Sequence, residues 1–249
     1  MDQSTQDCLF FIHIPKTAGT SVIDFLDRHY SADEIAPAML PEQLVLIPQG
    51  EIEKYRLLRG HFGYKYRMLL PKNTKTITIL RDPIERIISY YYYLRRESAR
   101  LPRNRVPEHV RVATSLSLEE FASSKELYFL TSNCQVSTLI STPRQNIDVY
   151  SHSQIVDLIT TRLSELFFVG FTEILESSVE TLCTLLGWCN DVSVQHLNTN
   201  QDHPSAKDLP SQVRQTIQDR NIYDYYLYNL AKSMFPTSVK AEATPDRNP

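Results

Sequence analysis

A short loop near the N-terminus carries residues that could bind an anion. Its sequence, between an apolar run and an amphipathic segment, is Pro15, Lys16, Thr17, Ala18, Gly19, Thr20, Ser21. A helix that begins there would offer free backbone N–H groups, Thr20 and Ser21 would add hydroxyl donors, and Gly19 would let a ligand approach closely. In a Walker A loop a lysine directly follows the last glycine. Here Lys16 lies three residues before Gly19, so the segment alone is consistent with a phosphate loop or with a tight turn that exposes a lysine.

A second candidate anion-binding segment follows a predicted strand at 76–80. Arg81 would lie at the carboxyl edge of the sheet, where open α/β sheets bind ligands, and its guanidinium could pair with a phosphate. Asp82 and Pro83 are typical of a helix start, and Glu85 would complete a capping box. Further residues of that helix are spaced to share one face: Arg86, Ser89 and Tyr93.

The hydrophobic pattern predicts strands that alternate with helices. Apolar, β-branched runs predict buried strands at 8–14, 57–58, 76–80 and 166–171. Helices are predicted from near Ser21, from 83 through the tyrosines at 90–93, and at 117–120, 133–140, 155–163, 172–187 (with Thr172 as the cap) and 211–235. This order predicts an α/β fold with a parallel sheet covered on both faces. We predict one domain over 1–236 and a flexible tail over 237–249.

Two motifs, in this order, resemble the carbohydrate O-sulfotransferases, the group that contains the heparan sulfate 2-O- and 6-O-sulfotransferases. Residues 13–21 resemble that family's loop for the 5′-phosphosulfate, and residues 80–91 resemble its Arg-Asp-Pro strand end followed by an arginine and a serine on a helix. Similar segments at 133–135, 168–173 and 198–199 extend the resemblance over residues 8–235. It implies a three-layer, P-loop-like α/β fold and 3′-phosphoadenosine 5′-phosphosulfate (PAPS) as the sulfuryl donor.

The resemblance also implies roles for single residues. The loop from Pro15 to Ser21 would bind the 5′ end of the donor, and Arg81 and Ser89 would bind its 3′-phosphate. Lys16 would stabilise charge on the leaving phosphate, and no metal would be required. Other residues could equally contact a ligand or serve ordinary packing and ion pairing: Arg86, Asn133, Gln135 and the 198–204 loop.

Transfer of a sulfuryl group to a hydroxyl also needs a base, and histidine is the usual base near neutral pH. Among seven histidines, His61 is the candidate, because it follows a predicted strand and lies between Gly60 and Gly63, a setting that can turn a side chain toward a cleft. The base of the resembling family also lies in a Gly-His segment between the two donor motifs. A structural role is the alternative for His61, and His13 is expected to face the packed side of its strand.

An arginine-rich stretch follows the second motif. Its members are Arg95, Arg96, Arg100, Arg103, Arg105 and Arg111, with Glu97 and Glu108 between them. The stretch is consistent with a surface that attracts an anionic acceptor, such as a uronic-acid or sulfated glycan, and equally with a solvated loop. The predicted acceptor is the hydroxyl of a carbohydrate or small molecule.

Composition excludes several other classes. The formal net charge of -3 argues against a general nucleic-acid binder, and the six glycines form no GxGxxG motif for a dinucleotide. The longest apolar run, 8–12, is too short to span a bilayer, no secretory signal begins the chain, and the four cysteines form no CxxC pair. We therefore predict a cytoplasmic, bacterial enzyme. Two alternatives stay open: a P-loop kinase or NTPase that requires magnesium and ATP, and a noncatalytic nucleotide-binding module.

Overall fold

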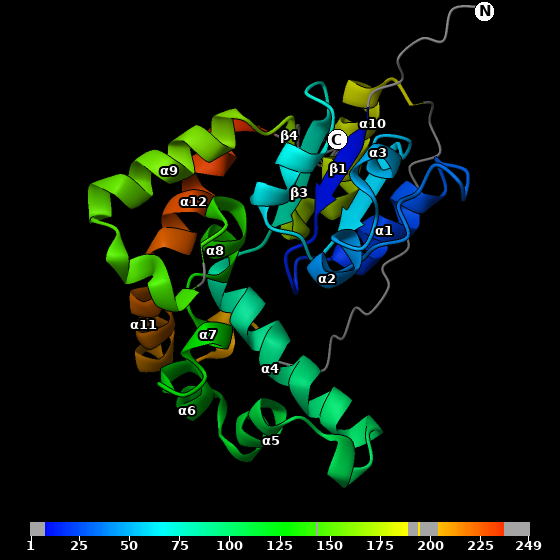
Figure 1. Cartoon of the computed structure of the whole chain (residues 1–249). Helices are drawn as coiled ribbons and strands as arrows, with labels where there is room; N and C mark the ends of the chain where they lie inside the picture. The colour runs from blue at the N-terminus through cyan, green and yellow to red at the C-terminus, as the bar shows by residue number, and fades with distance from the viewer. Residues whose placement is uncertain (1–7, 143, 189–193, 195–203, 237–249) are drawn as a thin grey trace, which may run out of the picture.

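A computed structural model of the chain describes residues 8–142, 144–188, 194 and 204–236. Within these residues, four strands form one parallel sheet in the order β2-β1-β3-β4 (Figure 1). The strands are β1 (Leu9–Ile12), β2 (Leu57–Gly60), β3 (Lys75–Leu80) and β4 (Phe168–Phe171). Every residue of β1 and β4 is buried, as expected for parallel strands that are covered on both faces.

Helices connect the strands and extend past them. The α-helices are α1 (Gly19–Asp27), α2 (Pro41–Leu44), α3 (Gln49–Ile52), α4 (Pro83–Arg100), α5 (Glu108–Ser115), α6 (Leu118–Ser123), α7 (Tyr128–Thr131), α8 (Cys134–Ile140), α9 (His152–Ser164), α10 (Leu175–Leu186), α11 (Ser211–Arg220) and α12 (Ile222–Met234). The 3-10 helices are η1 (Tyr64–Leu69), η2 (Arg103–Arg105), η3 (Arg144–Val149), η4 (Thr172–Ile174) and η5 (Ala206–Asp208).

Alternate residues of β1 pack against helices on opposite faces of the sheet. Phe10 and Ile12 lie in a core that the sheet shares with α8, α9 and α12. Leu9 and Phe11 lie in a core that the sheet shares with α1 and α10. Because side chains of a strand alternate between its faces, the result is a helical layer on each side of the sheet (Figure 1). The predicted three-layer α/β fold with a central parallel sheet is confirmed.

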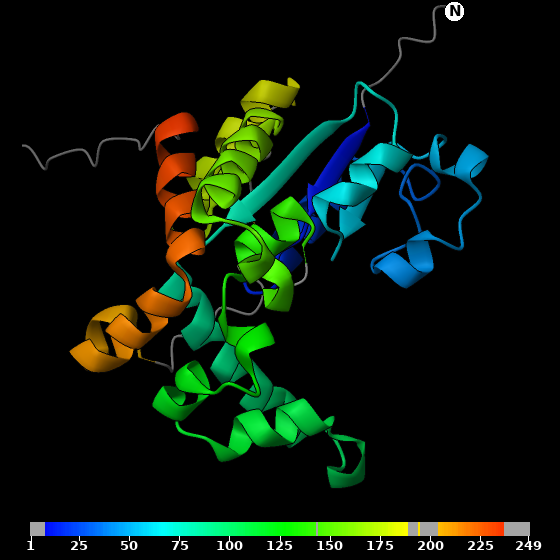
Figure 2. The ribbon, with the colours of Figure 1, turned by 60° about the vertical axis from the view of Figure 1, so that its left-hand side comes forward.

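A separate helical core lies beyond the carboxyl end of β3. It is built by α4, α5, α6 and α11, with Ile88, Phe121 and Ile217 almost fully buried. Figure 2 shows α4 leaving the end of β3 and running through this group. Since α4 spans 18 residues, it joins the edge of the sheet to the arginine-rich stretch.

Of the two contacts in the capping box predicted at the start of α4, the structure contains one. Asp82 does cap the helix, because its carboxylate accepts from the N–H groups of Ile84 (2.9 Å) and Glu85 (3.1 Å). Its own N–H, however, donates to the carboxylate of Glu173 at 2.8 Å rather than to Glu85. Glu173 follows β4, the neighbour of β3, so a contact across the sheet edge replaces the local one.

The cap predicted at Thr172 is also wrong. Helix α10 begins at Leu175, and the Thr172 hydroxyl instead donates to the carbonyl of Leu80 at the end of β3 (3.2 Å). The predicted end of this helix at Gly187 is confirmed, since Gly187 adopts the left-handed conformation typical of a C-cap. Helix α1 begins at Gly19, two residues before the predicted start.

Some predictions concern residues that the structure does not describe. The tail at 237–249 and, except for Pro204, the 198–204 loop lie outside the described residues. The single domain over 1–236 stays a prediction.

Candidate active site

The loop between β1 and α1 has an uncommon backbone conformation at two positions. Lys16 and Ala18 adopt left-handed conformations, with φ of 72° and 59°. Such conformations are uncommon for residues other than glycine and cluster at binding sites. The first hydrogen bond of α1 runs from the N–H of Val22 to the carbonyl of Ala18 (3.2 Å). The N–H groups at 19–21 therefore belong to the first turn of α1, at the positive end of the helix.

The side chains of the loop divide between the interior and the surface. Thr17 is fully buried, and its hydroxyl donates to the carbonyl of Ile14 at 2.9 Å, so this side chain stabilises the turn and leaves only its backbone N–H for a ligand. Ser21 is buried, Pro15 is half-buried and Thr20 is exposed. Of the two hydroxyls predicted as donors, that of Thr20 is the one open to solvent.

The ring of His13 packs directly on Gly19. A Cβ atom on Gly19 would lie 1.8 Å from Cδ2 of His13, so only glycine permits this approach. The same ring stacks on Phe11 and on His61, with centroid distances of 6.0 and 4.1 Å. Burial, and then the neighbouring His61 and Lys16, lower the pKa of His13 to about 3. His13 is therefore a neutral ring at physiological pH.

Lys16 points toward α4. Its Nζ lies 4.2 Å from the centroid of the Tyr93 ring, which is the geometry of a cation–π contact. Burial lowers the pKa of Lys16 to about 8, the charges of Arg96 and Arg81 act in the same direction, and the carboxylate of Glu97 opposes the shift. Lys16 is thus a cation held near other cations, and an anion bound among them would relieve this repulsion.

The end of β2 presents His61 to solvent. Gly60 has φ of 152°, and a Cβ there would lie 2.3 Å from the carbonyl oxygen of Met39. This turn leaves the His61 ring exposed, with Nδ1 3.0 Å from the carbonyl oxygen of His13. A carbonyl only accepts, so Nδ1 carries the proton and Nε2 of the neutral ring is an acceptor. The ring is nevertheless partly desolvated, which lowers the pKa of His61, whereas the hydrogen bond to the His13 carbonyl opposes this shift; the net lowering favours the neutral form.

Arg81 lies beside the loop at the end of β3. Its guanidinium contacts the carbonyl oxygen of Lys16 at 3.4 Å and the carboxylate of Glu85 at 3.8 Å. Its backbone N–H and C=O are both bonded to the side-chain amide of Gln135, at 3.0 and 2.9 Å. Burial lowers the pKa of Arg81, while Glu85 and Glu173 oppose that shift.

The two polar residues of α4 next to this group differ in their surroundings. Ser89 is half-buried, one turn before Tyr93. Arg86 is fully buried: its Nη2 lies 3.5 Å from the carbonyl oxygen of Leu130, whereas its Nε and Nη1 atoms have no hydrogen-bond partner within the described residues. Arg86 also acts to lower the pKa of Arg81. This buried cation therefore makes the site more positive without an exposed surface of its own.

The structure brings most of the predicted site residues together. Lys16, Arg81 and the backbone of the loop are in mutual contact, and His61 is joined to the loop through His13. Sequence reasoning missed the contact between Tyr93 and Lys16, and it missed Glu173 as the partner of Asp82. The position of Glu173 just after a predicted strand was a usable signal, because parallel strands end at one edge of a sheet.

Two features are absent from the described part of the chain. Among those residues, no cluster of three or more His, Cys, Asp or Glu side chains is arranged to hold a metal ion. None of the helices described there has the length and apolar character needed to cross a bilayer.

A sequence profile described as the sulfotransferase family matches residues 1–231. The chain belongs to the sulfotransferase family. The predicted resemblance to sulfotransferases is thereby confirmed, whereas the restriction to carbohydrate-specific and bacterial members stays a prediction.

The chain is similar to three proteins that are named as sulfotransferases. It shares 37% identity over 93 residues with the protein-tyrosine sulfotransferase of Arabidopsis thaliana, in a match that covers 36% of this chain and 18% of that protein. The sulfotransferase from Alicyclobacillus acidocaldarius is 14% identical, with 95% of this chain and 98% of that chain covered and a TM-score of 0.50. Mouse sulfotransferase SULT7A1, solved in complex with PAP (3′-phosphoadenosine 5′-phosphate), is 15% identical, with 86% and 63% covered and a TM-score of 0.38. The chain thus spans less than two thirds of the length of the plant and mouse proteins.

Proposed function

We propose that the chain transfers a sulfuryl group from PAPS to a hydroxyl of a carbohydrate or related acceptor. The observation that carries this proposal is the grouping of Lys16, Arg81 and an exposed His61 around the amino end of α1. Membership of the sulfotransferase family supports PAPS as the donor. A bound donor would supply a sulfuryl group attached to a phosphate, which is the leaving group.

The cationic groups of the site suit a donor that carries phosphate at two ends. The N–H groups at 19–21 and the Lys16 ammonium would hold the 5′-phosphosulfate, since helix N-termini and cations both favour anions. Arg81 would hold the 3′-phosphate through its planar guanidinium, and Ser89 would add a hydroxyl. Arg96 and Arg81, which lower the pKa of Lys16, support an anionic ligand at this place.

His61 and Lys16 would serve opposite ends of the reacting centre. Nε2 of His61 would accept the proton of the acceptor hydroxyl while the oxygen–sulfur bond to the acceptor forms and the sulfur–oxygen bond to the phosphate breaks. The ammonium of Lys16 would stabilise the charge that develops on the phosphate oxygen. The hydrogen bond between Nδ1 and the His13 carbonyl supports this role, because it holds the proton on Nδ1 and leaves Nε2 as the basic nitrogen.

Ligand binding measured by calorimetry in the presence of a chelator tests the donor site. We expect PAP to bind with a micromolar Kd, since two phosphates meet separate cations, and we expect no heat with ATP under the same conditions. Binding of ATP only when magnesium is present, with none for PAP, would support the kinase or NTPase alternative instead. PAP binding without transfer to any hydroxyl would indicate a noncatalytic module.

We further propose that the acceptor is anionic. Several arginines of the arginine-rich stretch already have partners. Arg95 donates hydrogen bonds to Tyr91 and Thr114, and ion pairs join Arg100 to Glu97 and Arg111 to Glu108. Within the described residues, the exposed guanidinium groups of Arg103 and Arg105 make no ion pair. These two cations support recruitment of a uronic-acid or sulfated glycan.

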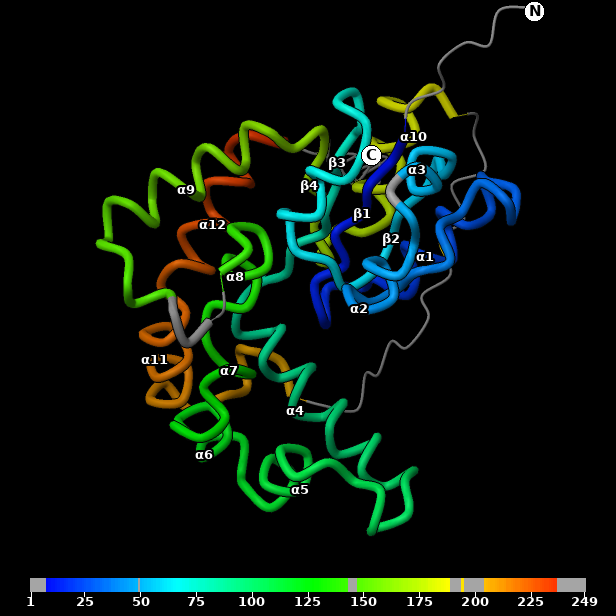
Figure 3. Tube along the Cα trace, viewed as in Figure 1, coloured from blue at the N-terminus to red at the C-terminus, as the bar shows by residue number. Residues whose placement is uncertain are grey.

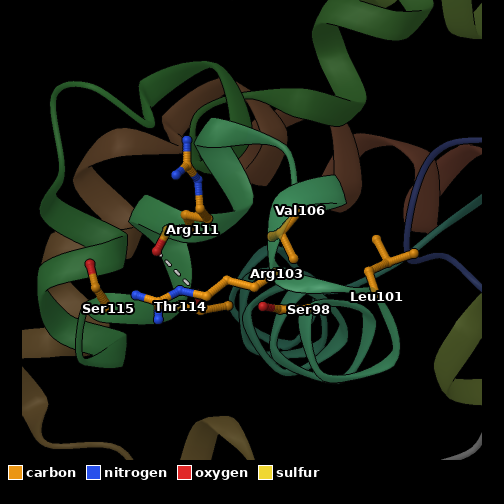
Figure 4. A pocket seen from close by; sticks show the side chains of 7 residues that line it. All are labelled: Ser98, Leu101, Arg103, Val106, Arg111, Thr114 and Ser115. Carbon is orange, nitrogen blue, oxygen red and sulfur yellow. Dashed lines mark hydrogen bonds between the residues drawn. The ribbon is translucent and has the colours of Figure 1, made fainter.

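A shallow hollow of about 350 Å³ next to these residues suits an acceptor chain. Its lining comprises Ser98, Leu101, Arg103, Val106, Arg111, Thr114 and Ser115. Figure 4 shows Arg103 extending across the hollow toward the helix that carries Thr114 and Ser115. Hydroxyls, cations and apolar side chains in one hollow can bind a sugar by hydrogen bonds and its acidic groups by charge.

Reversing one of these charges tests the acceptor surface. In Arg103→Glu we expect the KM for an anionic glycan to rise roughly tenfold, because the variant repels the acceptor instead of attracting it. The PAP Kd should stay unchanged, because Arg103 does not bind the donor. Lys54→Glu is the matched control, since Lys54 is exposed and follows α3, away from α5 (Figure 1). Equal KM values for the two variants, or transfer only to a tyrosine peptide, would refute an anionic glycan as the acceptor.

We propose that the protein works in the reducing environment of the cytoplasm. Cys8, Cys134 and Cys183 are buried and form no disulfide within the described residues, and burial raises the pKa values of Cys8 and Cys183. Protonated, buried thiols of this kind are structural groups.

A further inference from the structure

Gln135 binds the backbone of Arg81 from within the protein. The Gln135 side chain is fully buried. Its Oε1 accepts from the N–H of Arg81 at 3.0 Å, and its Nε2 donates to the carbonyl of Arg81 at 2.9 Å. An amide presents a donor and an acceptor side by side, so Gln135 pairs with the peptide groups of Arg81 as a neighbouring strand would.

The backbone of Gln135 is itself held by a buried carboxylate. Asp224 of α12 is fully buried, and its two oxygens accept from the N–H groups of Gln135 (3.2 Å) and Val136 (2.8 Å). In return, Oδ1 of Asn133 accepts from the N–H groups of Tyr223 (3.1 Å) and Asp224 (3.2 Å). Helices α8 and α12, which lie side by side in Figure 3, thus cap each other at their amino ends.

The result is a chain of buried hydrogen bonds from α12 through α8 to the residue that follows β3. The guanidinium of Arg81 has competing neighbours, the Lys16 carbonyl on one side and the Glu85 carboxylate on the other. Its backbone must therefore be fixed by other groups if the side chain is to meet a phosphate at a constant position. Asn133 and Gln135 are both buried, and the amide groups of their side chains bond the backbones of α12 and of Arg81.

We propose that Gln135 is a positioning residue that sets the affinity of Arg81 for the 3′-phosphate of the donor. This inference rests on the proposed function, because it assumes that Arg81 binds that phosphate. Within the described residues, the hydrogen bonds of Gln135 run to Arg81 and Asp224 and not to Lys16 or His61. Its loss would therefore weaken donor selection and leave the transfer step intact.

PAP and AMP form the ligand pair for the test, because they differ only in the 3′-phosphate. In Gln135→Met, which keeps the size of the side chain, we expect the ratio of the AMP Kd to the PAP Kd to fall roughly tenfold. The AMP Kd should stay at the wild-type value. In steady state, the donor KM should rise while kcat at saturating donor stays within about twofold.

Ser178→Ala is the matched control. Ser178 is fully buried, and its hydroxyl bonds both the N–H (2.9 Å) and the carbonyl (3.3 Å) of Phe171 at the end of β4. This variant should lower the Tm as Gln135→Met does, but it should leave the Kd ratio unchanged. If Gln135→Met does not fold, Gln135→Glu keeps the size and the acceptor for the Arg81 N–H, and its ratio should also fall.

The outcomes separate the inference from the proposed function. A wild-type ratio near one, or no effect of Arg81→Ala on it, would show that the 3′-phosphate site is wrong, and the inference would fall with it. A large wild-type ratio that Arg81→Ala removes and Gln135→Met preserves would overturn the positioning role alone. An equal loss in Gln135→Met and Ser178→Ala would also overturn it, because the effect would then follow general stability.

Discussion

Replacing His61 by alanine is expected to lower kcat by about 10²–10⁴-fold, the range for loss of a general base, while the PAP Kd stays at the wild-type value. The reason is geometric. Nδ1 of His61 is bonded to the His13 carbonyl, so Nε2 is the nitrogen that can take a proton from an acceptor. The ring lies on the β2 side of the loop, whereas the proposed phosphate ligands are the loop itself and Arg81. Single-turnover transfer and calorimetric PAP titration measure the two quantities separately.

The matched control is His152→Ala. His152 is exposed at the start of α9, and its ring lies beside that of Tyr223. We expect kcat in this variant within about twofold of wild type, since surface changes away from a site have small effects. Near-normal kcat in His61→Ala would move the base to another residue, and a parallel loss of PAP affinity would make His61 a donor ligand.

The pH dependence follows from the same contacts. Burial lowers the pKa of His61 below its ordinary value of 6.5, and a base must be unprotonated to act. The value of kcat/KM should therefore stay high as the pH falls toward 6.5 and should decline only below pH 6.5. His61→Ala should lose this acid limb. A wild-type decline that begins above neutral pH would contradict the assignment of His61 as the base.

The elements that hold the site were predictable because their signals are local. The apolar run at 8–14 contains β1, the run at 76–80 covers β3 except for Lys75, and Asp82 with Pro83 identified the start of α4. The loop at 15–21 was recognisable as a strand-to-helix connection for the same reason. Four-residue helices such as α2 and α3 were missed, since one turn is too short to show a 3.6-residue period.

The connections between these elements were not predictable from the sequence. Gln135 and Arg81 lie 54 residues apart, and Asp82 and Glu173 lie 91 apart. Each contact depends on which strand ends and helices become neighbours, information that a one-dimensional pattern lacks. The packing of His13 on Gly19 is similar: the sequence contains both residues, but only the turn of the backbone between them brings the ring onto the glycine.

Replacing Lys16 by methionine is expected to lower kcat by about 10²–10³-fold, the range for loss of one group that stabilises developing charge. The side chain keeps its length and loses its ammonium. In the structure this ammonium lies over the Tyr93 ring, so the chain is oriented toward α4 before any donor binds. Lys16→Arg should retain more activity than Lys16→Met because the positive charge remains, although a guanidinium does not match the position of an ammonium.

The basic limb of the pH profile distinguishes charge from geometry at Lys16. Burial lowers its pKa to about 8, so the cation is lost as the pH rises through that value, and kcat/KM should fall above pH 8. Lys16→Arg should show no such fall, because a guanidinium keeps its proton there. A bound anionic donor favours the charged form of Lys16 and raises its pKa, so the limb of kcat should lie at higher pH than the limb of kcat/KM. Coincident limbs, or a limb at pH 8 that persists in Lys16→Arg, would assign the titration to another group and leave Lys16 as a packing residue.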